Sequence, residues 1–245
     1  KKAKEYIEKG DIFQVVLSQR ISFKTEANGL KVFQKLNNKN NPYKYFFKLK
    51  DYELVGVSPE ILIKNDCGEI STVPIAGTIK KSNDLEENEK LKKKLLDDPK
   101  EKSEHLMLVD LARNDLGKVS KVGTVRVKEF MELKSFSHVT HITSLVTGDL
   151  KSENVLALKS MLPAGTLSGA PKIRAMEIIE ELEDSKRELY GGAIGYFGFN
   201  NQMEQLIHIR SLILKKNKGY LQVGAGIVKD SKGKKEYKET INKSK

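Results

Sequence analysis

The chain has 245 residues, of which 38% are hydrophobic and 31% charged, as is typical of a soluble globular protein. Its formal charge of +11 comes mostly from lysines spread over every segment, so a solvated lysine-rich surface explains the charge better than nucleic-acid binding. No apolar run approaches the ~18 residues of a transmembrane helix, and the single cysteine excludes an internal disulfide. We therefore expect a cytoplasmic protein that binds neither membranes nor nucleic acid.

Hydrophobic periodicity and turn residues divide the chain into groups of strands and helices. The strands are too numerous and too hairpin-like for a doubly wound parallel sheet. We therefore expect an α+β fold in which large antiparallel sheets pack together with helices on the outside. The expected strands cover 11–24, 45–50, 54–64, 69–80, 124–147, 192–199, 205–215 and 220–229, the second and third as a hairpin and the last three as a meander. The expected helices cover 1–9, 30–38, 83–96, 99–114 and 171–186, and a last one begins near 234.

Both ends of the chain lie inside helical patterns. The first residues are KKAKEYIEKG, without a methionine or the apolar core of a signal peptide, and the last are KEYKETINKSK. No repeat, linker or low-complexity segment divides the chain. We expect residues 1–245 to form one domain that is a fragment of a longer protein.

A loop of small residues, 163–170, leads into the helix that begins at Pro171. Proline suits a first helical turn, where its missing N–H costs nothing. Lys172 and Arg174 lie in that turn, although the helix dipole favours negative charge there. An anionic ligand at the free N–H groups would explain both cations. For this stretch alone, an ordinary turn with two solvated cations is the favoured alternative.

Two pairs of glutamates share a spacing of three residues. Glu101 and Glu104 lie on one helical face together with apolar residues that should be buried, and buried carboxylates need cations or a metal. Glu236 and Glu239 repeat the spacing on the last helix, where Lys243 follows one turn later. Four carboxylates without clustered Cys or His suit a hard cation such as Mg²⁺. The alternative is two solvated Glu/Lys helix faces.

Three other features carry weaker signals. His138 and His141 form an HxxH within a predicted strand, where residues three apart face opposite sides, so at most one of them reaches a site. The glycines of 224–226 allow a ligand to approach the backbone closely, or they mark a bulge in an edge strand. Arg210 and Gln14 lie in otherwise apolar strands, and an inward-facing Arg210 would need an anionic partner.

Taken together, these segments resemble the chorismate-utilising enzymes, and within them the anthranilate synthase component I group. The resemblance covers nearly the whole chain. It implies an Mg²⁺-dependent lyase that converts chorismate and ammonia into anthranilate and pyruvate, the first step of tryptophan biosynthesis. It rests on GDIFQVVLSQR, VSPEILIK, VPIAGT, EHLMLVDLARNDLGKV, HVTHITSLVTG, GTLSGAPKIRAMEII, YGGAIGYFGF, IHIRS, QVGAGIV and KEYKETINK.

The resemblance also implies roles for residues. Glu104 and Glu239 would ligate Mg²⁺, with Glu101 and Glu236 outside them through water. Glu60 matches the general acid for the departing 4-hydroxyl of chorismate. His141 matches a histidine of the second step, in which pyruvate leaves and the ring becomes aromatic, and Tyr190 and Arg210 match positions at the enolpyruvyl carboxylate. Three residues match further active-site positions: Gln14, Thr166 and Lys243. Five match other chorismate contacts: Gly77, Thr78, Gly224, Ala225 and Gly226.

Two positions favour the anthranilate synthase group over related enzymes. Aminodeoxychorismate synthases, the nearest alternative, typically have a lysine in the PIxGT motif, where this chain has Ala76. Isochorismate and salicylate synthases have a water-activating lysine at the position of Gln14, whose neutral amide suits attack by ammonia. A non-catalytic lysine-rich binding module is a remote alternative.

The resemblance further implies a partner. Ammonia would come from a separate glutamine amidotransferase subunit (component II), because Cys67 lies in a turn-like NDCGE without a neighbouring histidine. The chain also lacks most of the amino-terminal portion that completes the tryptophan feedback site in this family, so the resemblance leaves open whether tryptophan inhibits this chain.

Overall fold

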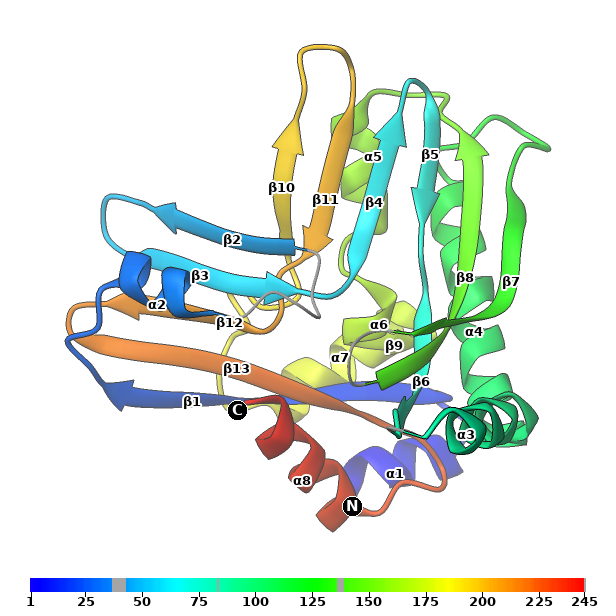
Figure 1. The fold of residues 1–245 in the computed structure, drawn as a ribbon, viewed down its shortest axis with the longest axis horizontal. Coiled ribbons are helices and arrows are strands. Elements are labelled where there is room, and N and C mark those ends of the chain that lie inside the picture. Colours follow the sequence, from blue (N-terminus) through cyan, green and yellow to red (C-terminus); the bar gives the residue numbers. More distant parts are fainter. Residues whose placement is uncertain (37–42, 83, 136–138, 245) are drawn as a thin grey trace. The chain divides into compact units, whose positions relative to one another are not determined.

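The computed structural model describes residues 1–36, 43–82, 84–135 and 139–244. They form two compact units, each built on one antiparallel sheet with helices, which confirms the α+β class (Figure 1). Unit 1 consists of Lys1–Pro59, Pro163–Ala193 and Ile207–Lys245, and unit 2 of Glu60–Leu162 and Ile194–Leu206. No helix in the described ranges is long and apolar enough to cross a membrane.

Unit 1 contains a six-stranded sheet. Its strands are β1 (Gln14–Lys24), β2 (Tyr43–Lys48), β3 (Glu53–Ser58), β9 (Gly169–Ala170), β12 (Ser211–Lys215) and β13 (Lys218–Ile227), and its helices are α1 (Lys2–Glu8), α2 (Gly29–Lys35), α6 (Gly165–Ser168), α7 (Lys172–Leu182) and α8 (Gly233–Lys243). The strand order is β2-β3-β12-β13-β1-β9, with β1 and β13 paired along most of their length. Ala3 of α1 and Ile178 of α7 are buried together with Val15 of β1, so these two helices cover one face of β1.

Unit 2 contains a seven-stranded sheet. Its strands are β4 (Ile61–Asp66), β5 (Glu69–Thr72), β6 (Ile75–Lys80), β7 (Arg126–Ser135), β8 (Val139–Asp149), β10 (Ala193–Phe197) and β11 (Met203–Ile207), and its helices are α3 (Leu85–Asp97), α4 (Pro99–Gly117) and α5 (Asn154–Met161). The order is β10-β11-β4-β5-β8-β6, and β7 pairs with β8. Figure 1 shows α4 running alongside β8, the strand that pairs with β5, β6 and β7.

The start of α4 follows its local sequence signals. The Asp98 carboxylate accepts hydrogen bonds from the backbone N–H groups of Lys100 at 2.9 Å and Glu101 at 3.3 Å. Pro99 occupies the first helical turn, where it leaves no donor unpaired. This helix start was predicted correctly, and so was the hairpin formed by β2 and β3.

Two of the predicted strands, 54–64 and 205–215, are each divided between the two sheets. The first becomes β3 and β4, separated at Pro59, and the second becomes β11 and β12, separated by a link that contains Arg210. The predicted meander is therefore wrong. Proline has no N–H for a ladder, and Arg210 has a φ of +50°, so neither position continues a strand. The apolar alternation nevertheless continues through both breaks, which is why sequence pattern alone merged them.

The helix predicted over 171–186 also differs from the structure. Part of the preceding loop is the short helix α6, and α7 ends at Leu182. Glu183 is extended (φ −93°, ψ +130°), and its carboxylate accepts a hydrogen bond from the backbone N–H of Ser18 at 2.7 Å. The helix ends because this side chain bonds to β1 instead of facing solvent.

Candidate functional site

The first glutamate pair lies on α4 in unit 2. Glu101 and Glu104 are half-buried, and Leu108 and Ala112 further along this helix are buried. Glu101 reaches a bulge in β6 at Gly77, whose φ is +63°: a Cβ built on Gly77 would lie 3.1 Å from Glu101 Oε2. The prediction that these carboxylates lie on a partly buried face is therefore confirmed.

His141 of β8 is held by the same bulge. Its Nδ1 donates a hydrogen bond to the carbonyl oxygen of Gly77 at 2.8 Å and lies 3.0 Å from the Thr78 hydroxyl. With the proton on Nδ1, a neutral imidazole carries its lone pair on Nε2 and can act there as a base. Unit 2 thus brings together Glu101, Gly77, Thr78 and His141, whereas His138 lies outside the described residues. Glu60, the expected general acid, is half-buried directly before β4.

The glycines of 224–226 lie in unit 1 on β13, where they pair with β1 beyond the pairing with β12, which ends at Leu221. The pairing with β1 is continuous through them, so the alternative of a bulge is wrong, and close packing explains these residues. A Cβ on Gly224 would lie 2.7 Å from the Tyr190 hydroxyl, and one on Gly226 would lie 2.8 Å from the Gln14 side-chain amide. Ala225 between them is buried. The backbone of β13 thus meets two of the predicted site residues.

Polar groups of the expected substrate site are buried here. Burial raises the pKa of Tyr190, as does the charge of Glu183, while Arg187 opposes the shift, so the phenol stays protonated at neutral pH and can donate. The Thr166 hydroxyl is buried and has no hydrogen-bond partner within the described part of the chain. Arg210 is exposed, and its carbonyl oxygen accepts from the N–H of Val57. The prediction that Arg210 lies within an apolar strand is wrong, because β11 ends at Ile207 and β12 begins at Ser211.

The second glutamate pair lies on α8 in unit 1. Glu236 is half-buried and Glu239 is exposed. Lys243 forms an ion pair with Glu239 at 2.7 Å and donates to the carbonyl oxygen of Gly224 at 3.1 Å. Lys243 therefore connects α8 to the backbone of β13.

The two pairs fit a hard cation by the chemistry of their donors. Carboxylate oxygens without thiolate or clustered imidazole suit Mg²⁺, which usually keeps several waters and needs few protein ligands. Within either unit, no three described His, Cys, Asp or Glu side chains are grouped so that they could hold a metal. The pair on α4 lies in unit 2 and the pair on α8 lies in unit 1.

Arg174 at the start of α7 has a local explanation. Its guanidinium donates to Asp11 at 2.9 Å and to Glu177 at 2.7 Å. These two carboxylates balance its charge in the first turn, so Arg174 is not evidence for an anionic ligand.

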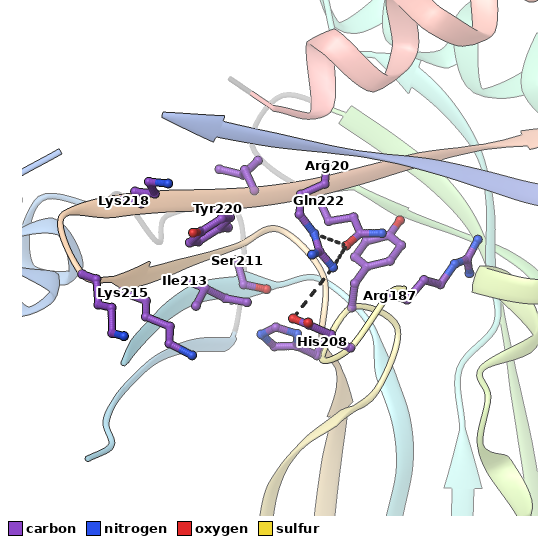
Figure 2. Close-up of a pocket in the computed structure, with 13 residues that line it drawn as sticks. Arg20, Arg187, His208, Ser211, Ile213, Lys215, Lys218, Tyr220 and Gln222 are labelled. Atoms are coloured by element: carbon purple, nitrogen blue, oxygen red, sulfur yellow. Dashed lines mark hydrogen bonds and ion pairs between the residues drawn. The ribbon is translucent and has the colours of Figure 1, made fainter. Parts of the chain in front are cut away.

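A pocket of about 440 Å³ opens in unit 1 beside Tyr190 (Figure 2). Lysine and arginine side chains outnumber acidic ones among the residues that line it. His208 also lines it: the pKa of this buried imidazole is lowered by desolvation, its Nδ1 donates to the Leu189 carbonyl at 2.9 Å, and its Nε2 has no hydrogen-bond partner among the described residues. The lining residues are Arg20, Arg187, Glu188, Tyr190, His208, Ser211, Ile213, Lys215, Lys216, Lys218, Tyr220, Leu221 and Gln222.

Sequence reasoning missed Arg187 and Glu183. They form a bidentate ion pair next to Tyr190, with distances of 2.9 and 2.5 Å. The available signal was an acid and a base four residues apart, a spacing that also describes an ordinary solvated pair on a helix. Because the helix was expected to continue to 186, Glu183 was assigned to its surface, and Arg187 fell just beyond its expected end.

Comparisons with known proteins agree with this geometry. A family model described as chorismate binding enzyme matches residues 1–245. Anthranilate synthase component 1 of Acetivibrio thermocellus is 52% identical over 99% of this chain and 50% of its own length, and that of Bacillus subtilis (strain 168) is 50% identical over 99% and 48%. The crystal structure of anthranilate synthase component I from Streptococcus pneumoniae TIGR4 matches with a TM-score of 0.92 and 46% identity, over 99% of this chain and 55% of that one. The chain thus spans about half the length of these relatives. It belongs to the chorismate-binding enzyme family.

Proposed function

We propose that this chain carries the catalytic site of an anthranilate synthase component 1, a lyase that converts chorismate and ammonia into anthranilate and pyruvate. The observation that carries the proposal is the 52% identity to a relative of that name over 99% of the chain. Gln14 also supports it, because its buried side chain is a neutral amide and cannot activate water as a base. Ala76 argues against aminodeoxychorismate synthase, the nearest alternative.

In the first proposed step, ammonia attacks C2 of the chorismate ring while the 4-hydroxyl leaves. The products are aminodeoxyisochorismate and water. Glu60 would donate the proton that the departing hydroxyl needs. Tyr190 would donate a hydrogen bond to the enolpyruvyl carboxylate, since burial keeps its phenol protonated, and Arg210 would bind the same carboxylate.

In the second proposed step, pyruvate leaves and the ring becomes aromatic. His141 would take the proton from C2 with Nε2, because Nδ1 already donates to the carbonyl of Gly77. The C–O bond to the enolpyruvyl group breaks with this proton transfer, and the released enolpyruvate gains a proton on carbon to become pyruvate. Thr78 would help to fix the plane of the imidazole.

Glu104 and Glu239 would ligate Mg²⁺, with Glu101 and Glu236 bound to it through water. When bound, the ion would offset the negative charge of the ring carboxylate. Lys243, which forms an ion pair with Glu239 in this structure, would remain close to the ring carboxylate of chorismate. The chain's own contribution would be carboxylates on α4 and α8, which suit hard cations such as Mg²⁺.

The component 1 names of the relatives imply a second component for those proteins. Here a glutamine amidotransferase subunit would supply the ammonia. The reaction would take place in the cytoplasm.

The direct test supplies the chain with chorismate, Mg²⁺ and ammonium and follows anthranilate by its fluorescence. We expect anthranilate only when all three are present, and none when EDTA removes the metal. Accumulating aminodeoxychorismate would establish the nearest alternative, and isochorismate would indicate attack by water. Absence of any chorismate-derived product would contradict the proposal.

A further inference from the structure

Arg187, on the link after α7, is fixed by hydrogen bonds from all three of its guanidinium nitrogens. Nε and one Nη donate to the two carboxylate oxygens of Glu183, and the side chains of this pair are only 19% and 6% exposed. The guanidinium also donates to the carbonyl oxygens of Val16 at 2.6 Å and Leu167 at 2.5 Å. A planar fork with this many fixed acceptors has one orientation, which lysine could not reproduce.

The pair bonds to the edge of β1 just beyond its pairing with β9. The carbonyl oxygen of Val16 accepts a hydrogen bond from Arg187, and the backbone N–H of Ser18 donates one to Glu183 at 2.7 Å. The Ser18 hydroxyl donates to the same carboxylate at 3.0 Å and accepts from the side-chain amide of Gln222 on β13 at 2.8 Å. Arg187 and Glu183 thus form the hydrogen bonds that a neighbouring strand would make with this edge of β1. Through the Ser18 hydroxyl they are also connected to Gln222 of β13.

Arg187 also contacts two turns that carry expected substrate groups. Its carbonyl oxygen accepts from the backbone N–H of Tyr190 at 3.0 Å, and its guanidinium lies 5.7 Å from the centre of the Tyr190 ring. Leu167, whose carbonyl it binds, directly follows Thr166 in α6. The guanidinium of Arg187 thus lies against the Tyr190 ring and binds the turn that holds Thr166, while the backbone carbonyl of Arg187 holds the main chain of Tyr190. Figure 2 shows Arg187 among the residues that line the pocket.

We propose that Arg187, oriented by Glu183, is a positioning residue that presents Tyr190 to the carboxylate of the enolpyruvyl group and fixes the turn of Thr166, another expected active-site residue. This inference rests on the proposed function for the identity of the substrate. Arg187 does not have to touch the substrate for this role, because its donors are used by Glu183 and by two carbonyl oxygens. Its contribution is the geometry of groups that bind the substrate.

The first test replaces Arg187 with lysine, which keeps the charge but loses the fork. The matched control is Arg174→Lys, on α7, where the arginine is paired with Asp11 and Glu177 but contacts none of the expected substrate groups. We expect Arg187→Lys to raise the chorismate KM about tenfold or more while kcat changes much less, as loss of binding geometry predicts. Arg174→Lys should leave both constants at wild-type values.

A second variant addresses folding. Removing one partner of a buried ion pair destabilises a protein, whereas replacing both with apolar residues of similar size is often tolerated. We therefore expect Glu183→Leu/Arg187→Met to recover Tm relative to Arg187→Met alone, with the chorismate KM still raised. A wild-type KM in this double variant, or in folded Arg187→Lys, would overturn the proposal.

A third measurement does not depend on turnover. With ¹³C-labelled tyrosine, the ring signal of Tyr190 can be assigned by its loss in Tyr190→Phe. We expect Arg187→Lys to shift and sharpen this signal as the ring gains mobility, and Arg174→Lys to leave it unchanged. An unshifted signal in Arg187→Lys would overturn the proposal. An inactive wild-type chain in which Arg187→Lys still shifts Tyr190 would contradict the proposed function and support Arg187 as the residue that holds Tyr190.

Discussion

The imidazole of His105 is hydrogen-bonded to the hydroxyl of Ser144 at 2.7 Å, and both residues are fully buried. This bond joins α4 to β8, one helical turn after Glu101 and three residues after His141. The Ser144 hydroxyl also accepts from the backbone N–H of Met131, which lies in a bulge of β7. One serine therefore connects a helix and two strands at the level of the proposed site in unit 2.

We expect Ser144→Ala to destabilise the chain by about 1–3 kcal/mol, because it leaves the Met131 N–H unpaired and removes the partner of His105. Urea unfolding of the two proteins measures this difference. Ser103→Ala is the control: its exposed hydroxyl donates only to the carbonyl of Pro99 within α4, and its effect should stay within about 0.5 kcal/mol. Equal effects of both substitutions would contradict a linking role for Ser144.

His208 predicts a pH dependence of stability. Burial lowers the pKa of this histidine below its ordinary 6.5, so the unfolded chain binds a proton more readily than the folded chain does. The stabilisation is fully present above pH 6.5 and is lost as the pH falls from there toward the lowered pKa, with a slope of at most about 1.4 kcal/mol per pH unit. Denaturant unfolding at several pH values should show a smaller loss in His208→Phe than in wild type. A wild-type NMR titration of His208 with an ordinary midpoint would contradict the prediction.

The sequence predicts those features of the site that depend on local spacing. Glu101 and Glu104 share a face because they lie three residues apart on α4, a helix whose start is marked by Asp98-Pro99. The last helix was also predicted, near 234, without such a start signal. Contacts between distant segments left no such signal. Gly226 meets Gln14 through strand pairing, and Arg187 meets Val16 only because α7 ends early. The two sheet changes, at Pro59 and near Arg210, were hidden because apolar alternation has the same period in either sheet.

Gly224 tests whether close packing on β13 serves substrate binding. Alanine there would place its Cβ 2.7 Å from the Tyr190 hydroxyl and 3.0 Å from the carbonyl oxygen of Leu17. The tyrosine must move, so we expect kcat/KM for chorismate to fall at least about tenfold, or about 1.4 kcal/mol of transition-state binding. Gly233→Ala, at the start of α8, meets no atom within 4 Å and should leave kcat/KM unchanged. Full activity in Gly224→Ala would show that Tyr190 is not needed at its present position.

Glu104→Gln tests the metal assignment, because it removes one negative charge while keeping the size of the side chain. We expect the loss of Mg²⁺-dependent anthranilate formation, and a weaker affinity for Mn²⁺ measured by electron paramagnetic resonance as a second readout. Glu104 is half-buried on the face that packs, so thermal unfolding must show that the variant is folded. Glu89→Gln on α3 is the control, because Glu89 forms an exposed ion pair with Lys92 and should affect neither activity nor Mn²⁺ affinity. Near-normal activity and Mn²⁺ affinity in Glu104→Gln would remove Glu104 from the metal site. The carboxylates of α4 would then have to stabilise the bulge at Gly77, which Glu101 already contacts.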